Sequence, residues 1–399
     1  MRTHWWIPAA ALVVASALAA CGVTASGGTS ATSETTLVSS PSAVSSSPEP
    51  ASPTASPSPT RILPTPAPAL KSTLPFPVGV AIDQRETTGV AGDVVTANFT
   101  QITPENHMKP EAWYDADHHF RIDPQATALM DFAKAHGLRV YGHCLVWHQQ
   151  TPSWFFQHDD GTQLTRDPAD QAILKDRLVG HITNIAKTLS DAYGPFGSPT
   201  NPLVAFDVVN EVVDGGGGFR STLWFSVLGA SYVDIAFQTA DEAFNHTYAA
   251  PGAKTPVTLF INDYGTEISS HAKAVHDFVA DLLARGIPVG GVGHQFHVKQ
   301  GVAPEALDEA LTTFEDLPVV QAVTEFDVPS GTPADEAALD KQADYVSEVF
   351  AVFRAHTLFS VTVWGLTDGR SWRASEGAPL LFDDSLAPKP AFYAAAGLW

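Results

Sequence analysis

Residues 204–211 read VAFDVVNE, a mostly apolar run that ends in Asn210 and Glu211. Runs of four to eight residues rich in Val, Ile or Phe are typical of strands buried in a parallel sheet. The pattern recurs along the chain, and each run is followed by polar residues. The expected strands are residues 77–82, 95–102, 138–144, 204–209, 257–261, 289–292, 319–323 and 359–364.

Helix-like stretches separate these runs. They are expected at residues 126–135, 173–189, 232–244, 271–284 and 335–353. Eight strands that alternate with helices over residues 74–399 predict a (β/α)8 TIM barrel in a single domain of the α/β class. A doubly wound open sheet would show the same alternation. It is disfavoured because no Gly-rich phosphate loop follows the first strand, and the glycines at 215–218 lack the spacing of a nucleotide motif.

The first 20 residues predict a signal peptide. Arg2 precedes an apolar run at residues 5–20 that is too short for a comfortable transmembrane span. The junction Leu18-Ala19-Ala20-Cys21 is similar to a bacterial lipobox, so we expect residues 1–20 to be removed and Cys21 to be lipidated. An ordinary secretory signal that happens to contain a cysteine is the alternative.

Residues 21–73 predict a disordered linker. In residues 41–60, 15 of 20 residues are Ser, Thr or Pro, and such a segment has too little apolar surface to offset the entropy of ordering. We therefore expect a secreted bacterial lipoprotein at the cell surface, with its folded domain, residues 74–399, outside the cell.

The charge of the chain excludes one large class of partners. The 22 basic and 43 acidic side chains give a formal net charge of −21, with −22 in residues 74–399 and +1 in residues 1–73. Such a surface repels nucleic acid and anionic membranes. We expect no nucleic-acid partner, membrane contact only through the lipid at Cys21, and a monomer.

Polar side chains follow most of the expected strands. Because the C-terminal ends of barrel strands meet at one face, we expect them to form one site. They are Glu105, Asn106 and Lys109; His143, Trp147 and Gln150; Asn210 and Glu211; Tyr264; Gln295 and His297; Glu325 and Asp327; and Trp364 and Trp372. Amides and carboxylates bind hydroxyls, and indole faces cover sugar rings, so these residues favour a neutral, hydroxyl-rich ligand.

Metal chemistry is not expected at this site. The histidine pairs 143 and 148, and 294 and 297, have no third ligand at zinc-like spacing. The two cysteines, Cys21 and Cys144, can form neither a cysteine-type zinc site nor a disulfide framework. We expect no metal and no other cofactor.

At these residues the chain resembles glycoside hydrolase family 10, the endo-β-1,4-xylanases, over essentially all of residues 74–399. The motifs that carry the resemblance are Glu105–Lys109, His143–Gln150, Asp207–Glu211 and Thr324–Asp327, in the family's order. Departures from the family pattern include Phe206 where Trp is usual, Gly265 where Asn is usual, Cys144 where Thr is common, and His107 beside Met108.

The resemblance implies that residues 74–399 hydrolyse β-1,4-xylosidic bonds in xylan and xylo-oligosaccharides by a retaining double displacement. It makes Glu211 the general acid/base and Glu325 the nucleophile, which His297 would hydrogen-bond with Asp327 behind it. Asn210 would bind the sugar 2-hydroxyl.

The resemblance also implies the remaining substrate contacts. Glu105, Asn106 and Lys109 would hold the sugar two units from the break on its non-reducing side. His143, Trp147, Gln150, Gln295 and Trp364 would surround the sugar at the break, Tyr264 would face the leaving group, and Trp372 would cover the glycone end.

Two alternatives remain at this point. The first is a retaining β-1,4-glucanase or mannanase, which shares Asn-Glu on the fourth strand and Glu on the seventh. The segment Glu105–Lys109 favours the xylanase over these enzymes. The second is a non-catalytic carbohydrate-binding barrel on the cell surface, which would be expected to lack Glu211 or Glu325; both are present.

Overall fold

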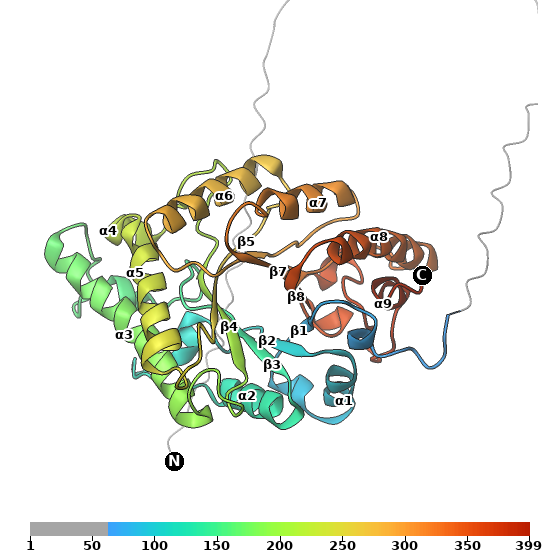
Figure 1. The fold of residues 1–399 in the computed structure, drawn as a ribbon, viewed down its shortest axis with the longest axis horizontal. Coiled ribbons are helices and arrows are strands. Elements are labelled where there is room, and N and C mark those ends of the chain that lie inside the picture. The colour runs from blue at the N-terminus through green and yellow to red at the C-terminus, as the bar shows by residue number, and fades with distance from the viewer. Residues whose placement is uncertain (1–62) are drawn as a thin grey trace, which may run out of the picture. The chain divides into compact units, whose positions relative to one another are not determined.

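A computed structural model describes residues 63–399, in which eight parallel strands close into a barrel in sequence order (Figure 1). The predicted (β/α)8 fold is therefore confirmed. The signal peptide, Cys21 and the linker up to residue 62 lie outside the described residues. Between residues 63 and 399, no helix has both the length and the hydropathy needed to cross a membrane.

Each strand overlaps one of the expected runs. The strands are β1 (Val78–Ile82), β2 (Gln101–Pro104), β3 (Arg139–Gly142), β4 (Leu203–Asn210), β5 (Thr258–Asp263), β6 (Gly291–His294), β7 (Val320–Phe326) and β8 (Leu358–Val363). The barrel closes between β1 and β8, where Val80 pairs with Val363.

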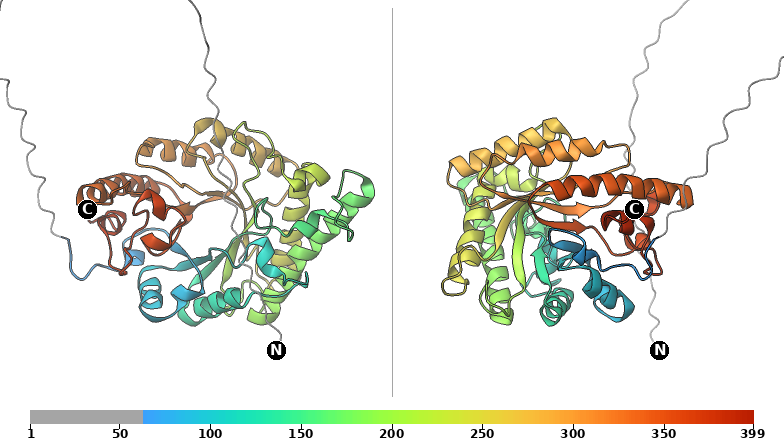
Figure 2. Two further views of the ribbon diagram at one scale, coloured as in Figure 1. Left: turned by 180° about the vertical axis from the view of Figure 1, so that it is seen from behind. Right: turned by 45° about the vertical axis from the view of Figure 1, so that its right-hand side comes forward.

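Helices form the outer layer around the barrel (Figure 2). They are α1 (Gly89–Asn98), α2 (Pro124–His136), α3 (Pro168–Tyr193), α4 (Leu223–Leu228), α5 (Ser231–Ala240), α6 (Ser269–Ala284), α7 (Pro304–Thr313), α8 (Glu336–Ala355) and α9 (Pro390–Ala395). Short 3-10 turns lie at Leu70–Ser72, Gln84–Thr87, Pro110–Trp113, Ser153–Phe156, Asp368–Arg370 and Ala374–Glu376, and a π-helical turn, Asp241–Thr247, extends α5.

Local sequence sets several of these helix ends. Proline occupies the first turn of α2, α3, α7 and α9, where its missing N–H costs no hydrogen bond. The Asp123 carboxylate accepts from the Gln125 N–H at the start of α2, and Gly137, with φ 65°, ends that helix. The Asp335 carboxylate caps α8 in the same way.

The predicted start of the second strand is wrong. The run at 95–102 was expected to be a single strand, but residues 95–98 form the last turn of α1, and β2 begins only at Gln101. Val95 is buried on the inner face of that helix. A short apolar run does not distinguish a buried helical turn from a strand, and here one run contains both.

Two glycines let bulky rings pack closely against the barrel strands, Phe260 inside the barrel and Phe206 on the side that faces the helices. A Cβ atom at Gly291 would lie 2.3 Å from the Phe260 ring, and one at Gly142 would lie 2.7 Å from the Phe206 ring. Phe206, which stands where the family usually has Trp, is fully buried in this way. A phenyl ring therefore packs closely against a bare strand, and this departure leaves no defect in the core.

The folded domain begins earlier than expected. The predicted linker ends at residue 73, but Leu70 has 0% exposed surface and belongs to the main core. Its N–H donates to the Asn98 side chain of α1 at 3.1 Å, and Leu63 packs partly against the same core. The boundary was set too late because a single anchoring leucine is hidden within a Pro-rich composition.

We expect Leu70→Ala to lower the free energy of unfolding by ~2–4 kcal/mol, because the substitution leaves a cavity in the core. A chain that starts at residue 74 should be destabilised at least as much, whereas one that starts at residue 63 should match the longer protein. Urea unfolding measures all three. Leu223→Ala, at an exposed position, is the control and should change stability by less than ~0.5 kcal/mol. Equal stability of the chains starting at 63 and 74 would restore the boundary at residue 73.

Candidate active site

Glu211 stands directly after β4 in a strained backbone conformation. Its φ is 58°, in the left-handed region that non-glycine residues adopt at a cost of about 1–3 kcal/mol. Two contacts hold it there. Its N–H donates to the Asn262 carbonyl at 2.8 Å, and its own carbonyl accepts from the Arg220 Nε at 2.8 Å. The strain aims the carboxyl group at the mouth of the barrel, where it lines a cleft.

Glu325, near the end of β7, is buried and held at both carboxylate oxygens. Oε1 accepts from the Asn262 side chain at 2.7 Å, and Oε2 lies 3.0 Å from the His297 Nε2. The other ring nitrogen of His297 lies 2.8 Å from the Asp327 carboxylate. Burial would lower the pKa of His297, but Asp327 and Glu325 outweigh it and raise the pKa to about 9. The ring is therefore an imidazolium at neutral pH and donates to both carboxylates.

The pKa values of Glu325 and Glu211 are shifted in opposite directions by their surroundings. Burial would raise the pKa of Glu325, but the His297 hydrogen bond, the fields of His143 and His297 and the Asn262 amide outweigh it, so the pKa is lowered. Burial raises the pKa of Glu211, and the charge of Glu325 adds to this, against hydrogen bonds from Trp147 and Gln295. One carboxyl group thus favours the ionised form and the other favours the protonated form.

Asp327 joins the site to the loop that follows β8. Besides His297, this fully buried carboxylate accepts from the Trp372 indole N–H at 2.9 Å and from an Arg373 Nη1 at 2.7 Å. Arg373 is itself buried and also binds Glu376. Trp372 is 61% exposed, yet its ring edge is fixed by this hydrogen bond.

A cleft of about 610 Å³ at the C-terminal ends of the strands contains most of the expected site. The predicted residues that line it are Glu105, Asn106, Lys109, His143, Trp147, Asn210, Glu211, Tyr264, Gln295, His297, Glu325, Trp364 and Trp372. Asp327 lies behind His297, where the resemblance placed it.

Gln150 is the one predicted contact that the structure does not bring to the cleft. Its amide donates to the Glu111 carboxylate at 3.2 Å, and its neighbour Gln149 lines the cleft instead. Gln150 has a φ of 44°, so the backbone turns at this residue, and its side chain reaches Glu111. A sequence pattern that assumes extended backbone cannot foresee that turn.

Hydrogen bonds and ring contacts hold the side chains that form the walls of the cleft. Lys109 donates to the Asn106 side chain at 3.1 Å, and its ammonium lies 5.1 Å from the centre of the Trp147 ring. His143 lies 2.8 Å from the Asp207 carboxylate, and its ring meets the Trp364 ring edge-on. These contacts fix the orientation of side chains that would otherwise be free to rotate.

Sequence reasoning missed Arg220. Its guanidinium donates to the Tyr264 hydroxyl at 2.6 Å as well as to the Glu211 carbonyl, and it packs on the Tyr264 ring. One cation thus joins the residue after β4 to the residue after β5. The only signal was its rarity as a cation in an acidic chain. Glu267 and Ile268, which also line the cleft, carried no signal at all.

Three of the four histidines considered as metal pairs, His143, His294 and His297, are held by other partners. Both ring nitrogens of His294 have partners, Thr266 at 2.9 Å and Gln321 at 3.0 Å, and burial lowers its pKa to about 4. Burial also lowers the pKa of His148 to about 4, with a contribution from the charge of Arg220. Cys144 is buried, which raises the pKa of its thiol well above the usual range and makes it a poor nucleophile.

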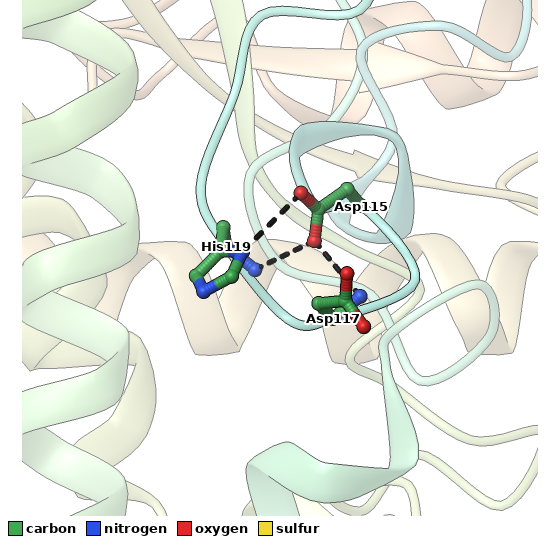
Figure 3. Close-up of side chains that lie close together, drawn as sticks. All are labelled: Asp115, Asp117 and His119. Atoms are coloured by element: carbon green, nitrogen blue, oxygen red, sulfur yellow. Dashed lines mark hydrogen bonds and ion pairs between the residues drawn. The ribbon is translucent and has the colours of Figure 1, made fainter.

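One group of residues with metal-like spacing occurs within residues 63–399, at Asp115, Asp117 and His119 (Figure 3). The Asp115 Oδ1 accepts from the backbone N–H groups of Asp117 and His119, each at 2.9 Å. The side chains of the other two are exposed. The carboxylate holds a tight turn, and this role accounts for the cluster.

The family model described as glycosyl hydrolase family 10 matches residues 69–397. The chain belongs to this family. It is 35% identical over 326 residues to an exoglucanase, XynX, of Acetivibrio thermocellus, and 34% identical over 326 residues to endo-1,4-beta-xylanase A of Thermoanaerobacterium saccharolyticum. Both matches cover 80% of this chain, but only 28% and 26% of these relatives, so the chain spans about a quarter of their length.

A relative of similar length and several solved structures also match. Endo-1,4-beta-xylanase A of Halalkalibacterium halodurans is 32% identical over 344 residues, which are 80% of this chain and 83% of that protein. The intracellular xylanase TsXylA of T. saccharolyticum, solved as a mutant with xylotriose, has a TM-score of 0.74 and 32% identity over 84% of this chain and 100% of its own. A second mutant of that enzyme, solved with xylotetraose, matches with the same TM-score, identity and coverage.

The carboxyl group of Glu105 should titrate near neutral pH. Burial and the neighbouring charge of Asp83 raise its pKa to about 7, against the charge of Lys109. Asp83→Asn removes one of the causes that raise the pKa of Glu105, so this pKa should fall by several tenths of a unit or more. Carbon NMR of labelled glutamate carboxyl groups measures the shift. Asp93→Asn on α1 is the control and should leave it in place. A pKa near 4.5 in the unaltered protein would contradict the assigned environment.

Proposed function

We propose that the described domain is a retaining endo-1,4-β-xylanase. The observation that carries the proposal is the pair of glutamates in one cleft of a family 10 chain, with the pKa of Glu211 raised and that of Glu325 lowered. Relatives named endo-1,4-beta-xylanase support it. So do the solved relatives that hold xylotriose or xylotetraose.

In the first step Glu325 attacks the anomeric carbon and forms a glycosyl ester. Its ionised form is available because His297 and Asn262 donate to its two oxygens. Glu211 gives its proton to the departing glycosidic oxygen, which leaves as the hydroxyl of the shortened chain. The two carboxyl groups of a retaining enzyme work about 5–5.5 Å apart on either side of that bond.

In the second step Glu211 changes from a proton donor to a proton acceptor. Once Glu325 is esterified, its negative charge no longer raises the pKa of Glu211, which therefore ionises more readily. Glu211 then takes a proton from water as the water attacks the anomeric carbon. The ester breaks, Glu325 leaves as a carboxylate, and the sugar keeps its original configuration.

The remaining cleft residues hold the chain. Glu105, Asn106 and Lys109 bind the sugar two units towards the non-reducing end, and Asn210 binds the 2-hydroxyl at the break. His143, Trp147, Gln295 and Trp364 surround that sugar, Tyr264 faces the leaving group, and Trp372 covers the glycone end. Gln149 takes the place first given to Gln150, because it is the glutamine that lines the cleft.

A β-1,4-glucanase is the second candidate, because a relative 35% identical to this chain is named an exoglucanase. One small group such as a hydroxymethyl is worth only ~1–3 kcal/mol in discrimination, so cleavage of both polymers is compatible with one cleft. Product analysis on xylan, carboxymethyl-cellulose and mannan, run side by side, separates the candidates. Preferred cleavage of carboxymethyl-cellulose or mannan would overturn the xylanase assignment.

We further propose that a lipid on Cys21 anchors the protein to the outside of a bacterial cell. The lipobox-like junction and the Ser/Thr/Pro-rich linker support this, since a linker of about 50 residues at ~3.1 Å each reaches on the order of 150 Å when extended. The domain would then meet its polymer beyond the membrane while the enzyme stays with the cell.

The anchor predicts the effect of Cys21→Ala. The variant should move from the membrane fraction towards the medium or the unprocessed precursor, because it has no thiol to carry the lipid. Fractionation followed by an activity assay measures the shift, and the specific activity of the domain should not change. Equal membrane retention of the variant and the unaltered protein would argue against lipidation.

Substitution of Glu325 and substitution of Glu211 should impair catalysis in different ways. Glu325→Ala removes the nucleophile, so turnover should disappear for every substrate. Glu211→Ala removes only proton transfer, so xylan cleavage should fall ~10²–10⁴-fold, while the first step on a dinitrophenyl β-xylobioside survives because that leaving group needs no proton.

Added azide should then restore turnover of the dinitrophenyl substrate in Glu211→Ala and give a β-glycosyl azide, which NMR identifies. An α-azide would mean inversion. If Glu325→Ala were the variant that azide rescues in this way, the two roles would have to be exchanged.

A further inference from the structure

His107 belongs to the segment Glu105–Lys109, which forms one wall of the cleft, but its ring has neighbours of its own. The His107 Nε2 lies 3.5 Å from the Asp83 Oδ1, and its Nδ1 lies 3.7 Å from the Asp123 Oδ2. Only 18% of the side chain is exposed. The imidazole is therefore held between two carboxylates, beside residues that line the cleft.

The pairing of β1 with β2 places Asp83 beside Glu105 (Figure 1). Ile82 pairs with Pro104 at the ends of these parallel strands, and the Glu105 N–H donates to the Ile82 carbonyl at 3.1 Å. The next residue of each strand, Asp83 and Glu105, therefore leaves the barrel at the same place. Two neighbouring carboxyl groups oppose each other's ionisation, because each charge repels the other.

The two oxygens of the Asp83 carboxylate have different surroundings. Oδ2 lies 3.6 Å from the guanidinium of Arg85, whose side chain is largely exposed. Oδ1 is buried and accepts no hydrogen bond within residues 63–399. The backbone is fixed, because the Asp83 N–H donates to the buried Glu86 carboxylate at 3.0 Å. Since Asp83 cannot easily move, the His107 ring is the group placed to compensate the charge on Oδ1.

Asp123 binds the other side of the ring and has partners of its own. Its Oδ1 accepts from the Gln125 N–H at 2.7 Å, and its Oδ2 lies 3.6 Å from the Arg121 Nη1 as well as near His107. A neutral imidazole has one N–H and can donate to one carboxylate, whereas an imidazolium can donate to both. Histidine rings change charge between about pH 5 and 8, so this bridge depends on pH.

Glu105 is sensitive to the charge of Asp83. Burial is the largest cause that raises the pKa of Glu105, to about 7, and Asp83 is the next. The charge of Glu86 also raises this pKa, while Lys109 and Arg85 lower it. A cation that compensates Asp83 therefore favours the ionised form of Glu105. That form is the stronger acceptor, because hydrogen bonds to a charged group are about twice as strong as neutral ones.

We propose that His107 is a positioning residue for the sugar two units from the break: its protonated ring compensates Asp83 and so keeps Glu105 ionised as the acceptor for that sugar. The inference rests on the proposed function, in which Glu105 binds this sugar. His107 is one of the residues at which the chain departs from the family pattern. Binding of the outer sugar then persists to a lower pH than a buried glutamate beside an uncompensated aspartate would allow.

His107→Gln tests the proposal, because an amide of similar size carries no charge at any pH. The measured quantity is kcat/KM for a dinitrophenyl β-xylobioside divided by kcat/KM for a dinitrophenyl β-xyloside, since only the xylobioside places a sugar at Glu105. This ratio should fall ~5-fold at pH 6, the effect of losing one nearby charge. At pH 8, where a histidine ring is neutral, it should equal that of the unaltered protein. His107→Lys, which keeps a cation, should retain the ratio at both pH values.

His356→Gln is the matched control. His356 also lies between two carboxylates, with Asp308 at 2.8 Å and Glu315 at 3.0 Å. It stands just before β8, at the end of the barrel opposite the cleft. Its substitution should leave the ratio of kcat/KM unchanged at both pH values, whatever it does to stability.

Three results would overturn the role of His107. The first is an equal ratio for His107→Gln and the unaltered protein at pH 6. The second is an equal fall at pH 6 and pH 8, which would indicate a purely structural role. The third is a fall in His107→Lys as large as that in His107→Gln.

A measurement that needs no activity separates this inference from the proposed function. Carbon NMR of labelled glutamate carboxyl groups should give the highest pKa for Glu105 in His107→Gln, a lower one in the unaltered protein and the lowest in His107→Lys. If His107→Gln does not fold, the comparison of His107→Lys with the unaltered protein decides, and equal pKa values would overturn the proposal. Cleavage of neither substrate by the unaltered protein would overturn the xylanase assignment, and with it the sugar-binding role of Glu105. An active protein whose Glu105 has the same pKa in all three forms would overturn only the role of His107.

Discussion

The side chain of Asn262, fully buried at the end of β5, holds the two halves of the site together. Its amide donates to Glu325 at 2.7 Å, its side-chain oxygen accepts from the Thr324 hydroxyl at 2.6 Å, and its main-chain carbonyl accepts from the Glu211 N–H at 2.8 Å. A Cβ atom at Gly293, on the neighbouring strand, would lie 2.5 Å from that side-chain oxygen. The close approach of β5 and β6 and the placement of both glutamates are therefore one constraint, and neither can change alone.

The order of the strands and the main site could be predicted from the sequence for physical reasons. Eight apolar runs that end in polar residues leave few folds open, and the barrel then requires those ends to meet. Details that depend on a single contact could not be predicted from the sequence. Leu70 is buried because it finds a place against α1, Gln150 turns away at a positive φ, and the value of Arg220 lies in two partners that are nine and 44 residues away. None of these leaves a periodic pattern in the chain.

Several of the few cations of this acidic chain are concentrated at the cleft. Lys109, Arg220 and Arg373 each bind groups that line or support it. Each is at least half-buried, so bulk salt screens these pairs less than it screens pairs on the surface. The negative exterior and the cation-braced interior thus respond differently to ionic strength, because the first is screened and the second is largely shielded.

The anchored indole of Trp372 has a thermodynamic consequence. An exposed aromatic ring usually samples several rotamers, and a ligand that stacks on it must restrict them, at about 0.5–1.5 kcal/mol for a flexible side chain. Here the hydrogen bond to Asp327 has already restricted the ring during folding. In the proposed function, a sugar that arrives at the outer end of the cleft meets a preorganised platform, so the entropy of ordering that side chain belongs to the folding of the protein and not to the binding of the polymer.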